Sequence, residues 1–228
     1  HPIQIDIAGT QESIAKIDAD LLYKCYDTFY NLNNMTLSIA GNISEDEVLA
    51  ICDELLRPCE DKGLETVFPD EPDTIVQAEI TEKNDIGASI FHLGFKCRPD
   101  SEIFLRKEMI ATLAVSYLTD ASTEMYNRLL SEEIINNSFG GEVFAGEGYF
   151  SVIFSGESEY PHKVREALFE EIQRISAEGI DKKMFSRIKK AAYGDLVRQL
   201  CNVTSMASAM ISSHMAGFEP FDVVDTVS

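Results

Sequence analysis

The sequence predicts an α+β domain in which helices pack on one face of a mainly antiparallel β-sheet. Residues 74–95 and 140–158 each contain a pair of apolar segments joined by a short turn, as neighbouring strands do. Residues 101–130 and 161–215 carry apolar residues at helical spacing instead. Strand pairs with helices grouped between and after them are typical of the α+β class.

Composition narrows the possible functions. The chain has 228 residues, of which 45% are apolar, so it can bury a substantial core. Its 39 acidic and 19 basic residues give a net charge of −20, which argues against nucleic-acid binding. No apolar run reaches 18 residues, so no membrane span is predicted. The one basic cluster, within residues 182–190, predicts a solvated helix face, with contact to an acidic partner as the alternative.

The cysteines indicate a reducing compartment. The five are widely spaced and include no CxxC pair, which argues against a disulfide framework. We therefore expect a cytoplasmic protein. Cys25 and Cys52 fall on apolar helix faces, where they are expected to be buried as small hydrophobic side chains.

The first predicted elements are a helix, a strand and a second helix. Asp18 has the residue type of an N-cap for a helix over residues 18–30, whose apolar residues share one face. An asparagine-rich turn follows, and the alternation in residues 35–40 predicts a strand. The second helix begins at the capping-box pair Ser44 and Glu47 and is expected to bury its apolar face.

Residues 57–73 separate this part from the rest of the chain. They contain three prolines and many charged residues, a composition typical of a linker. The sequence therefore predicts two domains, residues 1–56 and residues 74–228, joined by this segment.

The second domain opens with two predicted strands, residues 74–82 and 88–95, joined through residues 83–87. One face of the second strand carries an apolar row, namely Phe91, Leu93 and Phe95. His92 lies on the opposite face. A lone strand histidine is more often a packed or surface residue than a metal ligand, so we assign it no catalytic role.

Two helices and a hairpin follow. Residues 101–118 predict a long helix whose second half is apolar nearly all round, and which should therefore be deeply buried. A shorter helix begins at Ser122 and is expected to bury Met125, Tyr126, Leu129 and Leu130. Residues 140–158 predict a hairpin with its turn at 146–148. The glycine spacing matches neither GxGxxG nor GxxxxGK[ST], so a turn explains it better than a phosphate-binding loop.

Three helices complete the pattern. Pro161 begins one that ends at Gly179, and Asp181 caps the next. A third helix, rich in methionine, is predicted over residues 203–215. Its methionine spacing predicts core packing, with a binding groove as the alternative.

The sequence contains no self-sufficient catalytic motif. Its four histidines are far apart, and neither HExxH nor HxxEH occurs, so no zinc site is predicted. A G-x-S-x-G nucleophile elbow is also absent. The adjacent glutamates 132–133 and 170–171 point in different directions on a helix and are expected to be solvated charges.

The opening segment nevertheless resembles a known family. In order, it contains His1-Pro2, Gly9-Thr10, Ile14, Tyr30, Asn34-Met35 and Gly41-Asn42. This order is similar to the segment that follows the metal ligands in M16 (insulinase/pitrilysin-like) zinc metallopeptidases. ASIFHLGFKC at 88–97 and STEMYNRLLSEE at 122–133 continue the resemblance, which covers nearly the whole chain. IINNSF and FSGES resemble most closely the bacterial insulinase-like branch of the family.

The resemblance implies the LuxS/mitochondrial-processing-peptidase-like metallohydrolase fold and a parent zinc endopeptidase. Family members bind zinc through HxxEH and a later glutamate, all upstream of the family's His-Pro, and the HxxEH glutamate activates a zinc-bound water. Because the sequence begins at His1, we expect a fragment that holds no zinc and is inactive alone. Residues 1–56 would be the C-terminal part of a first M16 domain, and residues 74–228 a second one lacking its last elements.

The resemblance also suggests where substrate lies. Many M16 enzymes supply an Arg and a Tyr, seven residues apart, from the later domain to hold substrate. That register falls here at Leu130 and Asn137, with Arg128 nearby but out of register. Arg128, Asn137 and Phe139 are therefore the candidate substrate-facing residues, in a domain expected to bind and enclose peptide only.

Two functions follow from the resemblance. One is part of an active endopeptidase, whose partners are a missing N-terminal catalytic half and a peptide substrate. The alternative is a non-catalytic M16 homologue that acts as a structural or partner subunit, paired with a paralogue or a second copy. We also expect residues 18–56 to complete the sheet of the second domain, within one chain or by exchange between two, because residues 35–40 would otherwise expose a strand edge.

Overall fold

The structure is a computed structural model of the chain, and it forms two compact units. One unit combines residues 1–69 with 196–222, and the other combines residues 70–195 with 223–228. The residues that the structure describes are 2–68, 70–99, 104–219 and 221–227. The division at residue 69 lies inside the segment 57–73, in whose described residues no helix or strand is present.

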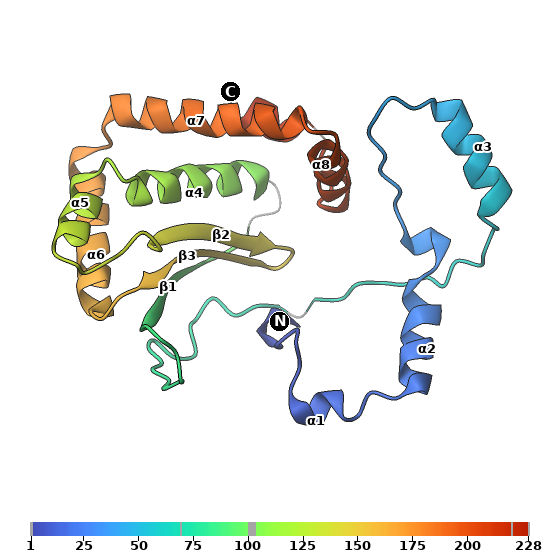
Figure 1. Cartoon of the computed structure of the whole chain (residues 1–228), viewed down its shortest axis with the longest axis horizontal. Coiled ribbons are helices and arrows are strands. Elements are labelled where there is room, and N and C mark those ends of the chain that lie inside the picture. The colour runs from blue at the N-terminus through green and yellow to red at the C-terminus, as the bar shows by residue number, and fades with distance from the viewer. Residues whose placement is uncertain (1, 69, 100–103, 220, 228) are drawn as a thin grey trace. The chain divides into compact units, whose positions relative to one another are not determined.

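The first unit is helical. Its elements are α1 (Gln11–Ile14), α2 (Ala19–Phe29), α3 (Glu45–Leu55) and α8 (Val203–Met215), with 3-10 turns at Pro2–Gln4 and Leu32–Asn34 (Figure 1). The helix expected after Asp18 is confirmed, and Asp18 Oδ1 accepts a hydrogen bond from the Leu21 amide at 2.8 Å. Ser44 is the N-cap of α3, but its side chain makes no capping hydrogen bond, so the predicted capping box is not formed.

The apolar faces of α2 and α3 are exposed. Leu22 on α2 is 60% exposed and Leu55 on α3 is 68% exposed. The prediction that these helices bury an apolar face is therefore wrong, and so is the expectation that Cys25 is buried. On α8, Met210 and Met215 are also exposed, against the expected core packing. Helical periodicity identifies the side that can pack, but the covering layer must come from another segment, and none of the described segments covers these faces.

Residues 35–40 form no strand. Met35 has extended dihedral angles (φ −126°, ψ 142°), but no described residue forms a β-ladder with this segment. Ser38 Oγ donates a hydrogen bond to the carbonyl oxygen of Ala207 at 2.9 Å. The strand prediction is wrong here, and residues 18–56 do not complete the sheet within this chain. Completion by exchange between two chains stays a prediction. A strand forms only where a neighbour accepts and donates its backbone hydrogen bonds, which alternation alone does not provide.

The second unit contains an antiparallel sheet of three strands in its described residues. The strands are β1 (Ile90–Cys97), β2 (Gly140–Gly146) and β3 (Tyr149–Glu157), in the order β1-β3-β2. The helices are α4 (Phe104–Thr119), α5 (Glu124–Ser131), α6 (Pro161–Glu178), α7 (Lys182–Leu200) and the short α9 (Asp222–Val227). The α+β class, the hairpin and the helix starts at Pro161 and after Asp181 are therefore confirmed.

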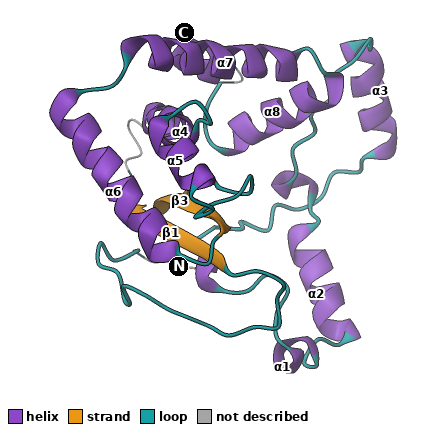
Figure 2. Ribbon diagram, turned by 60° about the vertical axis from the view of Figure 1, so that its left-hand side comes forward, coloured by secondary structure: helices purple, strands orange, loops and turns teal. Residues whose placement is uncertain are grey.

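The helices α4 to α6 cover one face of the sheet (Figures 1 and 2). α4 packs on β2, and α5 packs on α6. Phe154 of β3, Leu129 of α5 and Leu168 of α6 are almost completely buried between these layers. The predicted row of Phe91, Leu93 and Phe95 packs against this core, and His92 is exposed on the other face, as expected.

Three expectations for this unit are wrong. Residues 74–82 pair with no strand in the described part of the chain. The long helix is not buried all round, because α4 contacts the sheet on one side only and Ile110 on its other side is 58% exposed. Leu130 is not a core residue, since it lies at the end of α5 and is 37% exposed.

Acidic solution should destabilise this unit through carboxylates bound at helix ends. Burial alone would raise the pKa of Asp120, but hydrogen bonds from Ser122 and the charge of Arg187 lower it. Backbone N–H groups at the start of α7, Met184 first, lower the pKa of Asp181. Because these pKa values are lower in the folded chain than in the unfolded chain, the unfolded chain binds more protons in acid.

The free energy of unfolding should therefore fall as the pH drops below about 4, the ordinary carboxyl value. Urea titrations of the chain across this range will measure the slope. Replacing Asp120 with Asn should remove part of it, and an unchanged slope in that variant would contradict this origin.

Candidate functional site

A surface hollow lies where the loop after α5 meets the end of β3. It has a volume of about 380 Å³. We call it the Asn137 hollow, and its lining residues are Ala88, Ser89, Leu130, Glu133, Ile134, Ile135, Asn136, Asn137, Glu157, Ser158 and Glu159. Its size is that of a small-ligand or side-chain pocket.

The hollow contains some of the residues expected from the sequence and not others. Leu130 and Asn137 both line it, although seven positions separate them in the chain. Arg128 lies outside this lining and its guanidinium is 3.8 Å from the carboxylate of Glu170 on α6. Phe139 is a core residue, 5% exposed, so its predicted exposure to substrate is wrong for this structure. Phe139 packs inward because it lies at the end of the loop, immediately before β2.

The loop that forms one wall is held in an uncommon backbone conformation. Glu133 has φ 55°, the left-handed region, which is rare for residues other than glycine. The amides of Ile134 and Ile135 both donate to the carbonyl oxygen of Leu129, at 2.9 and 3.3 Å, and both side chains are buried. The helix therefore ends in a tight turn that leaves Asn137 on the surface.

Ser158 joins this loop to the strand. Its hydroxyl donates to the carbonyl oxygen of Ile134 at 2.6 Å and accepts from the Tyr160 amide at 2.9 Å. Its own amide donates to the carbonyl oxygen of Ser89 at 2.9 Å. Ser158 is 7% exposed, so these groups have no access to water as a substitute partner.

Replacing Ser158 with alanine should lower the free energy of unfolding by about 1–3 kcal/mol, since it leaves a buried carbonyl oxygen and a backbone amide without their partner. Ser155→Ala, on the open face of β3 just before Ser158, is the matched control and should have a much smaller effect. Equal destabilisation of the two variants, measured by urea denaturation, would contradict the role of Ser158.

The Asn137 hollow is acidic. Glu133, Glu157 and Glu159 contribute carboxylates, and no lysine, arginine or histidine occurs among its described lining residues. Asn136 Nδ2 donates to Glu157 Oε2 at 2.6 Å, which orients that carboxylate. Such a surface can accept hydrogen bonds from peptide N–H groups, but it offers no nucleophile with an adjacent base.

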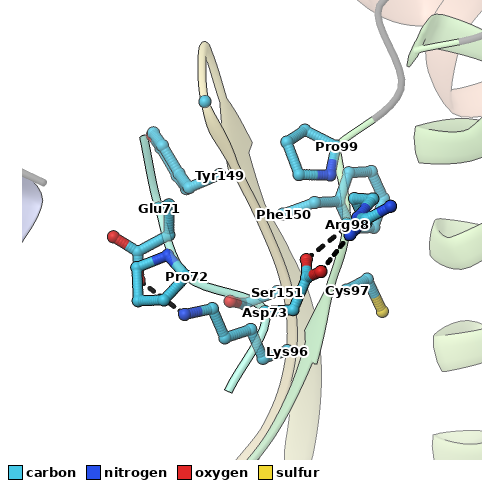
Figure 3. A pocket seen from close by; sticks show the side chains of 11 residues that line it. Glu71, Pro72, Asp73, Lys96, Cys97, Arg98, Pro99, Tyr149, Phe150 and Ser151 are labelled. Atoms are coloured by element: carbon cyan, nitrogen blue, oxygen red, sulfur yellow. Dashed lines mark hydrogen bonds and ion pairs between the residues drawn. The ribbon is translucent and has the colours of Figure 1, made fainter. Parts of the chain in front are cut away.

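A second hollow, of about 270 Å³, lies at the other end of β1 (Figure 3). Lys96 and Arg98 extend from the end of β1 toward residues 71–73, while Tyr149 and Phe150 of β3 form its other side (Figure 3). The cations are already neutralised: Lys96 pairs with Glu71 and Arg98 with Asp73. The two acidic residues and the two basic residues are each two positions apart in the sequence, a matching spacing that could have predicted these pairs.

Neither hollow can hold zinc. No group of three or more His, Cys, Asp or Glu side chains in the described ranges is arranged to bind a metal ion. The residues present therefore do not fit a catalytic zinc, which needs three protein ligands.

The described helices also include none that is long and apolar enough to cross a membrane.

Comparison with known proteins identifies the family. The family profile described as the Peptidase M16 inactive domain matches residues 16–192. The chain belongs to the M16 peptidase family. The resemblance inferred from the opening motifs is confirmed, and the matched profile is that of the inactive rather than the metal-binding domain.

Individual relatives agree with this M16 assignment. YmfH of Bacillus subtilis (strain 168), named as an uncharacterized zinc protease, is 26% identical over 234 residues, covering 98% of this chain and 54% of the relative. An M16-like peptidase from Alicyclobacillus acidocaldarius shares the fold, with a TM-score of 0.86, 24% identity and coverage of 100% of this chain and 56% of that one. A protease from Helicobacter pylori has a TM-score of 0.77 at 12% identity, over 96% and 58% of the two chains. This M16 chain thus spans about half the length of the relatives it matches.

Proposed function

We propose that this chain is the part of an M16 zinc endopeptidase that encloses peptide and binds no metal. The match of the inactive-domain profile to residues 16–192 is the observation that carries the proposal. The name of YmfH, a zinc protease, supports a zinc enzyme as the whole protein. The zinc, its HxxEH helix and the hydrolytic water then belong to an N-terminal catalytic half, and the fold is that of the LuxS/mitochondrial-processing-peptidase-like metallohydrolases. The free cysteines and acidic composition support a cytoplasmic location.

The Asn137 hollow is the proposed peptide contact within this half. The Asn137 side chain can donate a hydrogen bond to a peptide carbonyl and accept one from a peptide N–H. Because this amide is neutral, the contact does not require a charge to be buried. An asparagine here orients substrate but cannot supply the positive charge that an arginine would give to an oxyanion. This half therefore contributes to peptide affinity rather than to the chemical step.

The test separates this half from the whole protein. The purified 228-residue chain is expected to contain no stoichiometric zinc and to leave an unfolded, fluorescently quenched peptide uncut. The same residues within the full-length protein are expected to contain one zinc and to cleave that peptide. One tightly held zinc per isolated chain, or peptide cleavage by it, would contradict the proposal. A full-length protein without zinc would instead identify a non-catalytic M16 subunit.

Variants of the hollow test whether this half contributes to peptide binding or to the chemical step. In the full-length protein, Asn137→Ala should raise KM by several-fold and leave kcat nearly unchanged. The substitution removes an interaction that stabilises the bound substrate and the transition state equally. Glu142→Gln, an exposed position on β2 outside the hollow, is the control and should change neither constant. A fall in kcat without a change in KM would show that Asn137 acts in the chemical step instead.

A further inference from the structure

Three cations meet at one end of β1, in a chain whose net charge is −20. Lys96 lies near the end of β1 and Arg98 just beyond it, and both line the hollow of about 270 Å³ (Figure 3). Lys107 of α4 donates a hydrogen bond to the carbonyl oxygen of Arg98, and its Nζ lies 4.9 Å from the centre of the Phe150 ring. Basic side chains from two elements of the second unit therefore gather at this place.

A short acidic segment of the same unit occupies these cations. We call residues 71–73 the acidic latch. Glu71 Oε1 lies 2.5 Å from Lys96 Nζ, and the Asp73 carboxylate accepts two hydrogen bonds from Arg98, one of them from Nε at 2.9 Å. The latch supplies the only carboxylates among the described lining residues of the hollow. Without the latch, the charged groups that line this hollow would all be positive.

The latch shows the geometry of the ligand that these cations accept. Pro72 favours extended backbone angles at Glu71, and in an extended chain the side chains of alternate residues project to the same side. Both latch carboxylates can then reach the cations together. Pro72 lines the same hollow as the rings of Tyr149 and Phe150 (Figure 3). The contacts thus fit an acidic segment that has a compact apolar residue between two carboxylates.

The latch can leave the site without breaking secondary structure. It belongs to the segment 57–73, whose described residues form no helix or strand. The side chains of Arg98 and Asp73 are 77% and 55% exposed, and ion pairs so open to water contribute little to stability. A tethered segment still has an effective concentration on the order of millimolar. A second acidic peptide would therefore have to displace the latch.

We propose that Lys96, Arg98 and Lys107 form a docking site for an acidic peptide, and that the acidic latch occupies this site until such a peptide displaces it. The site selects a segment with two carboxylates two residues apart, as in the latch. Lys107 lies next to Arg98 and offers a further cation to a peptide longer than the latch. This inference does not depend on the proposed peptidase function.

Fluorescence anisotropy with a labelled peptide tests the site. The probe carries the sequence of residues 70–74, Asp-Glu-Pro-Asp-Thr, between glycine spacers. Neutralising the latch with Glu71→Gln/Asp73→Asn should tighten binding of this probe by about tenfold, as expected if the latch fills about nine-tenths of the sites. A probe with Gln and Asn in place of its Glu and Asp residues is the ligand control and should not bind.

The role of the cations is tested in the chain with the neutralised latch. Lys96→Gln/Arg98→Gln should weaken binding of the acidic probe by about tenfold, because two ion pairs and a forked hydrogen bond are lost together. Lys182→Gln/Lys183→Gln, on α7, removes the same charge elsewhere and is the matched control, which should bind the probe unchanged. Charge reversal with Lys96→Glu/Arg98→Glu should transfer binding to a Lys-Pro-Lys probe, which a chain with an unfolded site would not bind.

Three results would overturn the proposal. The first is no binding of the acidic probe to the chain with the neutralised latch. The second is equal binding with and without the latch carboxylates, since the latch would then not occupy the site. The third is an equal loss of binding in the α7 control, which would show that net charge rather than this site attracts the probe.

Discussion

Replacing Phe154 with alanine is expected to lower the free energy of unfolding of the sheet-containing unit by about 3–5 kcal/mol. Phe154 is 1% exposed and lies on the central strand of the sheet. Its ring meets that of Phe95 edge-on, with centroids 6.0 Å apart and planes at 87°. Truncation removes this contact and leaves a cavity between β3 and the helices, which the surrounding layers can fill only in part.

Phe144→Ala is the matched control, because Phe144 lies on the open face of β2 and is 43% exposed. Its replacement should cost less than about 1.5 kcal/mol, since 43% of its surface is already in water. Hydrogen exchange of the β3 amides will measure the stability of the sheet-containing unit separately from that of the helical unit. Similar losses in the two variants would show that the core does not lie where Phe154 is placed.

Gly156→Ala should cost about 1–3 kcal/mol, although it adds only one methyl group. A Cβ at this position would lie 2.9 Å from the Cα of Phe139 and 3.2 Å from its amide nitrogen. These are backbone atoms that cannot rotate away, so the loop leading into β2 would have to shift. The expected result is a lower urea midpoint with an unchanged denaturant slope.

Gly94→Ala is the corresponding control on β1, because its added Cβ meets nothing within 4 Å. This change should be neutral or slightly stabilising, as alanine loses less conformational freedom on folding. If both alanine variants lost the same stability, strand propensity rather than the close approach of Phe139 would be the cause.

The sequence predicted best those features that depend on neighbours along the chain. The start of α2 at Asp18, the start of α6 at Pro161 and the cap of α7 at Asp181 are as expected, because helix ends are set within one turn. The hairpin around Gly146–Gly148 is also local. These signals need no information about the rest of the fold.

Features that need a distant partner were predicted poorly. The alternation in residues 35–40 and 74–82 is compatible with a strand, but neither segment has a ladder partner in the described structure. For the candidate site, the alignment to the family pointed to Leu130 and Asn137, and both line one hollow. Phe139, a third candidate position, is instead buried in the core. The left-handed conformation of Glu133 could not be expected, since glutamate carries no local signal for it.

The exposed apolar faces of α2 and α3 have a consequence for how the isolated chain behaves in solution. At low ionic strength its net charge of −20 keeps molecules apart, because the repulsion extends over about 30 Å at 0.01 M salt. At 1 M salt that range shrinks to about 3 Å, and the apolar faces of two molecules can meet. Concentrated salt should therefore drive self-association of this polyanion, and dilute buffer should keep it dispersed.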